Sequence, residues 1–166
     1  MKYLQKHEIN RRLFTLIASE GSNYIIPDDF QAFMKSKLEH NLGLLEKHPG
    51  LEFLRAFNEF QDRYMETVIL RIFFTVDIND DGRISFREFK KSNLKQVLFQ
   101  VCEEEDINRI RDYFSYEHFY VLYIRFWELD SDHDFLISKE DFGKYEGHAL
   151  SRKVVNRIFE QVPRKF

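Results

Sequence analysis

The chain has 166 residues and a net charge of −3, so it can bury a core of its own, and its mild acidity argues against nucleic acid as the main partner. Its single cysteine excludes an internal disulfide framework, and no apolar run approaches the length of a membrane span, so we expect a protein of the cytoplasm or nucleus. The 18 phenylalanines, against 6 glycines and 3 prolines, favour a mostly helical fold.

One apolar frame recurs around three loops of EF-hand length, at residues 18–29, 77–88 and 130–141. A phenylalanine stands four residues before each loop, an aliphatic residue directly before it, an isoleucine at its eighth position and a phenylalanine directly after it. In chain order these residues are Phe14, Ile17, Ile25 and Phe30, then Phe73, Val76, Ile84 and Phe89, then Phe126, Leu129, Ile137 and Phe142. The repeat predicts an all-α fold of EF-hand helix–loop–helix units with short β pairing between loops.

Loop 18–29 lies in an expected N-terminal helical region, residues 1–60. Ala18, Glu20 and Ser22 occupy its first three ligand positions, so the loop keeps the apolar frame without the metal chemistry. We interpret it as a structural copy of a metal-binding loop. Further along, the run HPGL at 48–51 marks a turn between two helices.

Loop 77–88 belongs to a second expected region, residues 61–166, and matches the EF-hand pattern at every position. We expect the run 66–76 to form its entering helix and the run 87–101 its exiting helix. Calcium takes about six to eight oxygen ligands. Here they would come from the side chains of Asp77, Asn79 and Asp81, the Arg83 carbonyl, Ser85 through a water, and both carboxylate oxygens of Glu88.

The sixth position of loop 77–88 is Gly82, where the chain makes a sharp turn that glycine adopts at low cost. The alternative interpretation is an acidic surface loop that binds no metal. Because both flanking helices are predicted, the calcium-binding interpretation is the one we adopt.

Two further helices are predicted between the second and third loops. The run EEEDIN, 103–108, would start a short helix, because carboxylates are favourable near a helix N-terminus. The run YEHFYVLYIRFWEL, 116–129, would enter the third loop and carries aromatic residues on more than one side. Such a helix either packs between two EF-hand lobes or forms an exposed interface.

Loop 130–141 keeps the first five ligand positions and departs from the pattern at two others. Its ligands would be the side chains of Asp130, Asp132 and Asp134, the Leu136 carbonyl, Ser138 through a water, and Asp141. Phe135 stands in place of glycine at the sixth position, where a left-handed conformation costs on the order of 1–2 kcal/mol. Asp141 is one methylene shorter than the glutamate expected at the twelfth.

We expect loop 130–141 to hold a divalent cation, either calcium or, because its ligands are fewer, magnesium. A decayed loop like the first is the alternative. His133, at the fourth position, would point away from the ion. After the loop, the run GHALSRKVVNRIFEQV predicts a last helix with Ser151 as its N-cap.

Enzyme motifs do not occur in the sequence: it has no nucleophile elbow, no phosphate-binding glycine loop and no metalloprotease motif, so we do not expect an enzyme. Calcium sensors that grip target helices expose methionine-rich grooves, and this chain has three methionines only.

Three runs carry a resemblance to a known family. HPGLEFL, EFQDRYMETVILRIFFTV and EEEDINRIRDYFSYEHFYVLYIRFWELDSDHDFLIS are similar to the B-double-prime regulatory subunits of protein phosphatase 2A, and the similarity extends from about residue 20 onward. That family continues beyond RIFEQVPRKF and before this start, so the chain resembles a fragment.

The resemblance implies an elongated helical protein that docks on the scaffold of the phosphatase next to its catalytic subunit, directs the enzyme to protein substrates and responds to calcium. It also implies calcium at loop 130–141, because family members use a similar aspartate-rich loop without the glycine. Loop 77–88 departs from the family, since many members lack its ligands. The expected function is therefore that of a regulatory, non-catalytic phosphatase subunit, and a stand-alone calcium sensor or buffer is the alternative.

Overall fold

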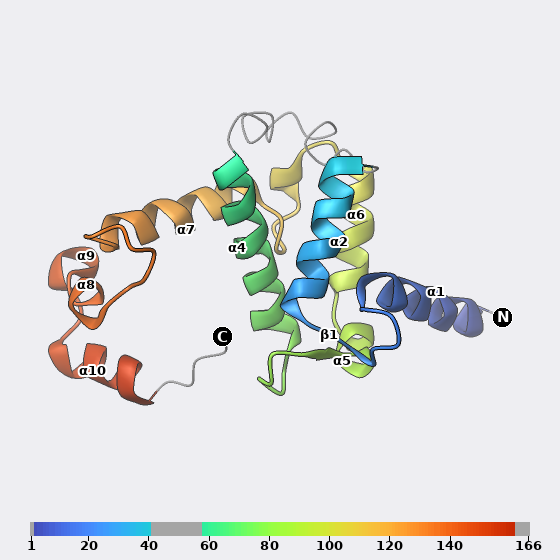
Figure 1. Ribbon diagram of the computed structural model, residues 1–166, viewed down its shortest axis with the longest axis horizontal. Helices are drawn as coiled ribbons and strands as arrows, with labels where there is room; N and C mark the ends of the chain where they lie inside the picture. Colours follow the sequence, from blue (N-terminus) through green and yellow to red (C-terminus); the bar gives the residue numbers. More distant parts are fainter. Residues whose placement is uncertain (1, 41–57, 162–166) are drawn as a thin grey trace. The chain divides into compact units, whose positions relative to one another are not determined.

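The computed structural model describes residues 2–40 and 58–161, which form two compact units, Met1–Tyr116 and Glu117–Arg164 (Figure 1). We refer to them as unit 1 and unit 2. Both are built from helices, as the composition predicted. The turn expected at 48–51 lies outside the described residues.

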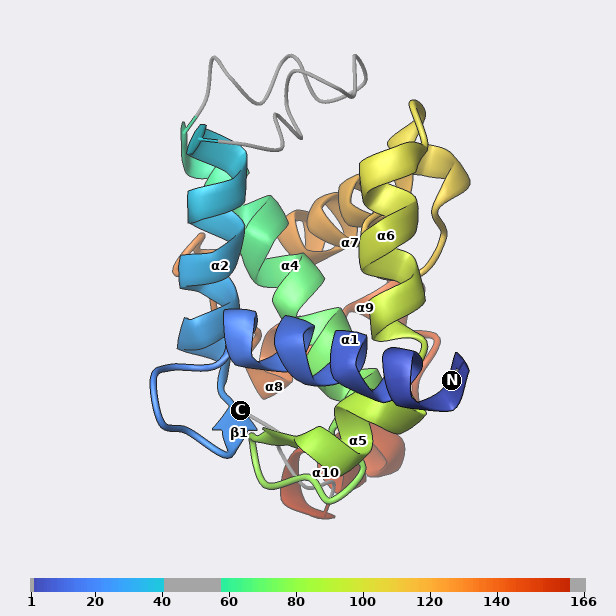
Figure 2. The same cartoon turned by 90° about the vertical axis from the view of Figure 1, so that its right-hand side faces the viewer.

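Unit 1 is a group of helices around two loops. Helix α1 (Lys2–Ile17) packs against α2 (Pro27–His40) and against α5 (Phe86–Lys91). Helix α2 in turn packs along α4 (Asn58–Val76), and α5 contacts α6 (Leu94–Glu103). Figure 2 shows α1 crossing in front of this group, with α2 and α6 on either side of α4.

Two short strands join the loops of unit 1. Strand β1 (Tyr24–Ile25) pairs antiparallel with β2 (Ile84–Ser85), with Tyr24 opposite Ser85 and Ile25 opposite Ile84. Both isoleucines are fully buried. The predicted β pairing between loops is thus confirmed, and it joins the degenerate loop 18–29 to the complete loop 77–88.

The frame phenylalanines of these two loops form the core of unit 1. Phe14, Phe30, Phe73 and Phe89 are all buried. Their rings form edge-to-face pairs between the two motifs, Phe14 with Phe89 at 5.7 Å between ring centroids and Phe30 with Phe73 at 6.4 Å. Each pair joins a residue outside one loop to a residue outside the other, so the two helix–loop–helix motifs share a single core.

The exit from loop 77–88 differs from the prediction of one helix over 87–101. Helix α5 ends at Lys91 and α6 begins at Leu94, because Ser92 is extended (φ −73°, ψ 169°). Asn93 in the break donates to Asp112 Oδ2 (2.9 Å) and accepts from the hydroxyl of Tyr113 (2.7 Å). These contacts with a distant segment hold the chain out of the helix.

The acidic run at 103–108 ends α6 and then starts a 3₁₀ turn, so the predicted short helix is present only as a single turn. Helix α6 stops at Glu103, and a single 3₁₀ turn, η2 (Ile107–Arg109), follows. Asp106 caps this turn by accepting from the backbone N–H of Asn108 at 3.0 Å. The preference of carboxylates for a helix N-terminus therefore applies only to Asp106, the last acidic residue of the run.

Unit 2 contains α7 (Tyr116–Leu129), α8 (Lys139–Phe142), α9 (Tyr145–His148) and α10 (Arg152–Gln161). The predicted bounds of α7 are confirmed, and Ser151 caps α10 through its hydroxyl, which accepts from the N–H of Val154 at 3.4 Å. Helix α8 packs against α10, where Phe142 meets Phe159 at 5.8 Å between ring centroids.

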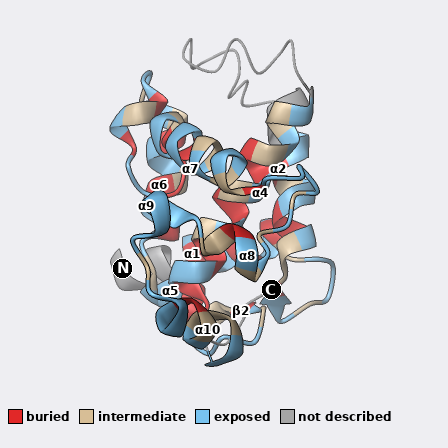
Figure 3. Cartoon of the chain, turned by 90° about the vertical axis from the view of Figure 1, so that its left-hand side faces the viewer, coloured by how far each residue is buried: buried red, intermediate tan, exposed pale blue. Residues whose placement is uncertain are grey.

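The two units are buried to different degrees. Figure 3 shows buried residues along α2, α4 and α6 of unit 1, whereas the helices of unit 2 are coloured mostly as exposed or intermediate. The frame residues Phe126, Ile137 and Phe142 of unit 2 are half-buried. On α7, Phe119 is buried while Tyr120 and Trp127 are exposed.

The boundary between the units lies at residues 116–117, whereas the sequence pattern predicted a division near residue 60. The paired strands explain this difference, because they bind the N-terminal motif to the loop at 77–88. Among the described residues, no helix combines the length and the apolar character needed to cross a membrane.

Candidate metal centre

Asp77, the first position of loop 77–88, organises the turn of that loop. It follows α4 directly and is 1% exposed. Its Oδ1 accepts from the N–H of Asp80 at 2.8 Å, and its Oδ2 accepts from the N–H of Gly82 at 2.9 Å. Gly82 has φ +74°, so the predicted left-handed turn at the sixth position is present.

Glu88, the twelfth position, closes loop 77–88 from its other end. Its Oε1 accepts from the N–H groups of Ile78 (3.2 Å) and Asn79 (3.3 Å), and its Oε2 accepts from the N–H (2.9 Å) and hydroxyl (2.7 Å) of Ser85. Ser85 also caps α5, so the two residues form a reciprocal capping box. The sequence at 85–88 thus starts the helix and aims a carboxylate into the loop.

The pKa of Glu88 lies below its ordinary value although burial raises it. The hydrogen bonds from Ser85, Asn79 and Ile78 lower the pKa by more, because they stabilise the ionised carboxylate. Asp81 at the fifth position accepts from the N–H of Arg83 at 3.0 Å and is exposed, as is Asn79. Arg83, whose backbone carbonyl is a predicted metal ligand, follows in the same turn.

Loop 130–141 brings three carboxylates together. Oxygen atoms of Asp130, Asp132 and Asp134 all lie within 4.8 Å of one another. Asp130 is fully buried and accepts from the N–H groups of Asp134 (3.2 Å) and Phe135 (2.9 Å), as Asp77 does in its own loop. Phe135 has φ +64°, so the phenylalanine takes the left-handed conformation that glycine takes at Gly82.

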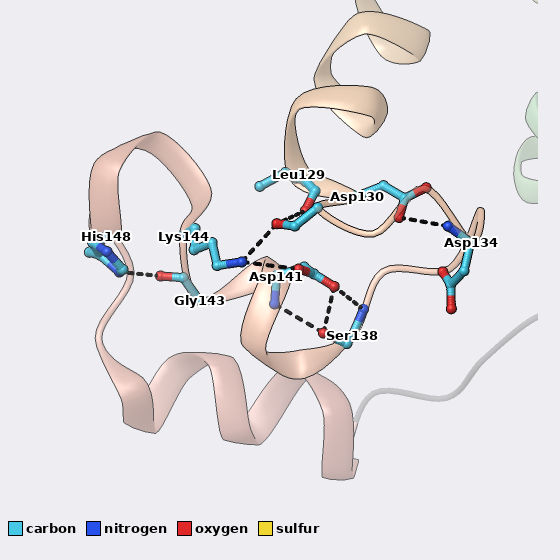
Figure 4. Close-up of polar contacts among 9 residues, drawn as sticks. Leu129, Asp130, Asp134, Ser138, Asp141, Gly143, Lys144 and His148 are labelled. Carbon is cyan, nitrogen blue, oxygen red and sulfur yellow. Dashed lines mark hydrogen bonds and ion pairs between the residues drawn. The ribbon is translucent and has the colours of Figure 1, made fainter.

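Asp141 closes loop 130–141 differently from Glu88. Its Oδ2 accepts from the N–H (3.2 Å) and hydroxyl (2.6 Å) of Ser138, which caps α8. Its Oδ1 accepts from Lys144 Nζ at 3.3 Å (Figure 4). The Ser138 hydroxyl first, followed by the side chains of Ser131 and Lys144, lowers the pKa of Asp141 to about 2, so the group is a carboxylate at neutral pH.

The oxygen atoms that both loops present are suitable ligands for a hard divalent cation. Carboxylate, amide, carbonyl and hydroxyl oxygens are the ligands that calcium and magnesium prefer, and each loop presents them on a turn between two helices. Loop 77–88 has the longer glutamate at its twelfth position, and loop 130–141 has the denser carboxylates. Metal binding by these predicted ligands, including Leu136, stays a prediction.

Loop 18–29 presents a different polar set. Its twelfth residue, Asp29, accepts from the N–H of Ile26 at 3.0 Å and from the hydroxyl of Ser19. Ala18 stands where Asp77 and Asp130 stand in the other loops. Hydrogen bonds from Asp29 to other residues of the loop thus hold its two ends together. This agrees with the interpretation of loop 18–29 as a structural copy of a metal-binding loop.

The contacts of Lys144, and the stacking of His133 on Trp127, were not predicted from the sequence. Lys144 Nζ donates to Ser131 Oγ at 2.7 Å as well as to Asp141. His133, which is exposed as expected, stacks on Trp127 with ring centroids 3.8 Å apart and planes 12° apart. The spacing of Lys144, three residues after Asp141 on a helical segment, was the available signal.

Known proteins resemble this chain in both sequence and fold. Residues 8–105 match the EF-hand domain family. A probable B''delta regulatory subunit of serine/threonine protein phosphatase 2A from Arabidopsis thaliana is 50% identical over 96% of this chain and 28% of its own length. The human beta member of the B'' regulatory subunits is 43% identical over 95% of this chain and 26% of its own length.

A solved chain of a PP2A PR70 holoenzyme, whose name also carries "diCa", matches with a TM-score of 0.79 and 43% identity, over 90% of this chain and 54% of that one. The chain spans well under half the length of the curated relatives it matches, 28% and 26% for the two described. It belongs to the EF-hand domain family and, within it, to the group of proteins named B'' regulatory subunits of protein phosphatase 2A.

Proposed function

We propose that this chain is the calcium-binding part of a regulatory subunit of protein phosphatase 2A. In this proposal it docks on the scaffold and catalytic subunits, directs the enzyme to protein substrates, and performs no catalysis itself. It acts in the cytoplasm or the nucleus. The relatives named above are regulatory subunits of the phosphatase, which supports the assignment.

The observation that carries the proposal is the geometry of the two loops. Each has a buried aspartate at its first position, Asp77 or Asp130, whose carboxylate accepts from the backbone of the turn. Each has a twelfth-position carboxylate that is also part of a helix cap. These groups face one turn from both ends, as an EF-hand cation site requires.

We assign calcium to loop 77–88, and calcium or magnesium to loop 130–141. Bound there, the cation neutralises several carboxylates at once and draws together the two ends of the loop. Glu88 and Asp141 lie in the first turn of the exiting helices α5 and α8, so their position affects the angle at which those helices leave the loops. Loss of the cation would therefore loosen the surface that these helices help to form.

Exposed apolar side chains support a role in binding a partner. Phe74 on α4 and Ile78 at the second position of loop 77–88 are 70% and 72% exposed, and they lie one helical turn apart along the chain. On α7 of unit 2, Tyr120, Val121 and Leu122 are each at least half exposed. Exposed apolar side chains of this kind are candidates for contacts with a partner protein.

Calorimetric titration of the purified chain into a scaffold–catalytic phosphatase core, in calcium and then in excess chelator, tests the proposal. We expect binding that weakens on chelation. The variants Asp77→Ala and Asp130→Ala should weaken binding in calcium, because each removes the first-position ligand of one loop. Glu20→Ala is the matched control, since it removes an exposed carboxylate from the degenerate loop.

Absence of binding in both conditions, with the chain folded by circular dichroism, would contradict docking by this chain. Strong calcium-induced exposure of apolar surface without affinity for the core would instead favour the stand-alone sensor.

A further inference from the structure

The twelfth-position carboxylate reaches the second position in all three loops, each time by a different contact. In loop 18–29, Asp29 accepts directly from the hydroxyl of Ser19. In loop 77–88, Glu88 accepts from the backbone N–H of Ile78. In loop 130–141, Asp141 contacts the Ser131 side chain, and the side chain of Lys144 contacts both residues.

Lys144 bridges loop 130–141 with its ammonium group. Nζ donates to Asp141 Oδ1 at 3.3 Å and to Ser131 Oγ at 2.7 Å (Figure 4 shows the contact with Asp141). The backbone that carries Lys144 is also held, because its N–H donates to the Asp141 carbonyl at 2.9 Å. Asp141 is one methylene shorter than Glu88, and the ammonium adds a bridge between Asp141 and Ser131.

Only one oxygen of Asp141 faces away from its own helix cap. Oδ2 accepts from both the N–H and the hydroxyl of Ser138, whereas Oδ1 has the lysine as its partner. A cation that is bound by a single oxygen of Asp141 would take Oδ1, because Oδ2 is held by the cap. Lys144 and a divalent cation therefore require the same atom.

We propose that Lys144 is a built-in competitor of the metal ion at loop 130–141. Its ammonium group holds Asp141 in the closed loop and must leave before Asp141 can bind the cation, which lowers the calcium affinity of this loop. The inference rests on the proposed function, because it presupposes metal binding there. Loop 77–88 has no such competitor among the described residues, since Glu88 accepts only from Ile78, Asn79 and Ser85.

The released lysine has acidic groups within the same cavity. Lys144 lines a cavity of about 290 Å³ together with Glu128 and Glu146, two carboxylates of unit 2. Both face Arg125, at 3.0 Å and 3.6 Å. In this proposal the ammonium moves from Asp141 toward these two carboxylates when the cation binds.

The test compares Lys144→Met with Lys139→Met. Lys139 belongs to the same loop, but its Nζ pairs with Glu160 at 2.9 Å. Both variants remove one positive charge, and only the first frees Asp141. Lys144→Arg retains the positive charge at position 144 and is the charge-preserving control. Calcium affinities come from calorimetry, and Trp127, the single tryptophan, reports on this loop through its stack with His133.

We expect Lys144→Met to bind calcium at loop 130–141 about three- to five-fold more tightly than the unaltered chain, as for a partly exposed ion pair. Lys139→Met and Lys144→Arg should stay within about two-fold of it. In chelator, Lys144→Met should also melt at a lower temperature, because the bridge between Ser131 and Asp141 is lost.

If Lys144→Met and Lys139→Met increased the calcium affinity equally, the effect would come from the change in net charge, and the inference would be overturned. Unchanged or weaker binding by Lys144→Met would also overturn it. In either case calcium would still bind to the loop, so the proposed function would stand. If neither the unaltered chain nor Lys144→Met changed its tryptophan fluorescence or released binding heat for this loop, metal binding there would fail together with the inference.

Discussion

At the scale of single residues, the three loops share backbone geometry more closely than they share sequence. The fourth position is left-handed in each, with φ of +76° at Gly21, +59° at Asp80 and +58° at His133. At the sixth position Gly82 and Phe135 are both left-handed, although one is glycine and the other is a large aromatic. The turn is therefore imposed by the hydrogen bonds to Asp77 and Asp130, and glycine only lowers its cost.

Gly82→Ala tests this interpretation against Gly21→Ala. Both glycines have a positive φ and open space around a built Cβ, so each substitution should cost about 1 kcal/mol of unfolding free energy in chelator through backbone strain alone. Chemical denaturation measures that cost. Only Gly82→Ala should also weaken calcium binding, because Gly21 lies in the loop without the ligand set. Equal calcium affinity in both variants would show that the turn at Gly82 does not position ligands.

At the scale of elements, one long helix is tied to a distant loop by side-chain contacts. The hydroxyl of Tyr64 on α4 donates to the carbonyl of Phe114 at 2.5 Å, and the guanidinium of Arg71 donates to the carbonyls of Tyr113 (2.7 Å) and Arg111 (3.0 Å). The same loop holds Asn93 in the break between α5 and α6. The segment before α7 thus fixes both α4 and the end of the exiting helix.

Tyr64 should make the stability of unit 1 depend on alkaline pH. Burial raises the pKa of Tyr64 far above its ordinary value, with Arg71 acting weakly in the opposite direction. A raised pKa means that the neutral form is favoured in the folded state, so its contribution is complete below about pH 10 and is lost as the pH rises further.

Tyr64→Phe should lower the unfolding free energy by about 1–3 kcal/mol at neutral pH, because the Phe114 carbonyl loses its partner. It should also reduce the alkaline loss of stability without abolishing it, since the pKa of Tyr113 is raised as well, by burial first and then by Asp112. Urea denaturation at several pH values measures both effects. An unchanged alkaline slope in the variant would assign that slope to other groups.

At the scale of the whole molecule, the loops are arranged as one pair and one loop with no strand partner among the described residues. Loops 18–29 and 77–88 share strands and core, while loop 130–141 belongs to unit 2. The degenerate loop is therefore the structural partner of the loop that has the complete set of predicted ligands. Ile25 is fully buried in that pairing, and the equivalent Ile137 in unit 2 is half-buried.

Ile25→Ala and Ile137→Ala form a matched pair for this arrangement. We expect Ile25→Ala to cost about 2–4 kcal/mol of stability, because it opens a cavity in the core of unit 1. It should also weaken calcium binding at loop 77–88, although it removes no ligand. Ile137→Ala should cost less. Thermal denaturation and calcium calorimetry measure the two effects, and an unaffected loop 77–88 in Ile25→Ala would contradict the structural role of loop 18–29.

Much of the fold and most of the candidate site follow from short-range patterns. The frame of Phe14, Ile25, Phe73 and Ile84 predicted the EF-hand motifs and the core, because apolar spacing within a helix–loop–helix unit is a local property. The positions of Asp77, Glu88, Asp130 and Asp141 were equally readable, since an EF-hand loop draws its ligands from consecutive residues. The sequence by itself therefore determined the fold class and the candidate metal ligands.

The tertiary structure decided what depends on residues far apart in the chain. It placed the unit boundary at 116–117, broke the exiting helix where Asn93 meets Asp112 and Tyr113, and paired loop 18–29 with loop 77–88. It also placed Lys144 against Ser131. No local propensity encodes these contacts, because each forms only when separate segments have packed against one another.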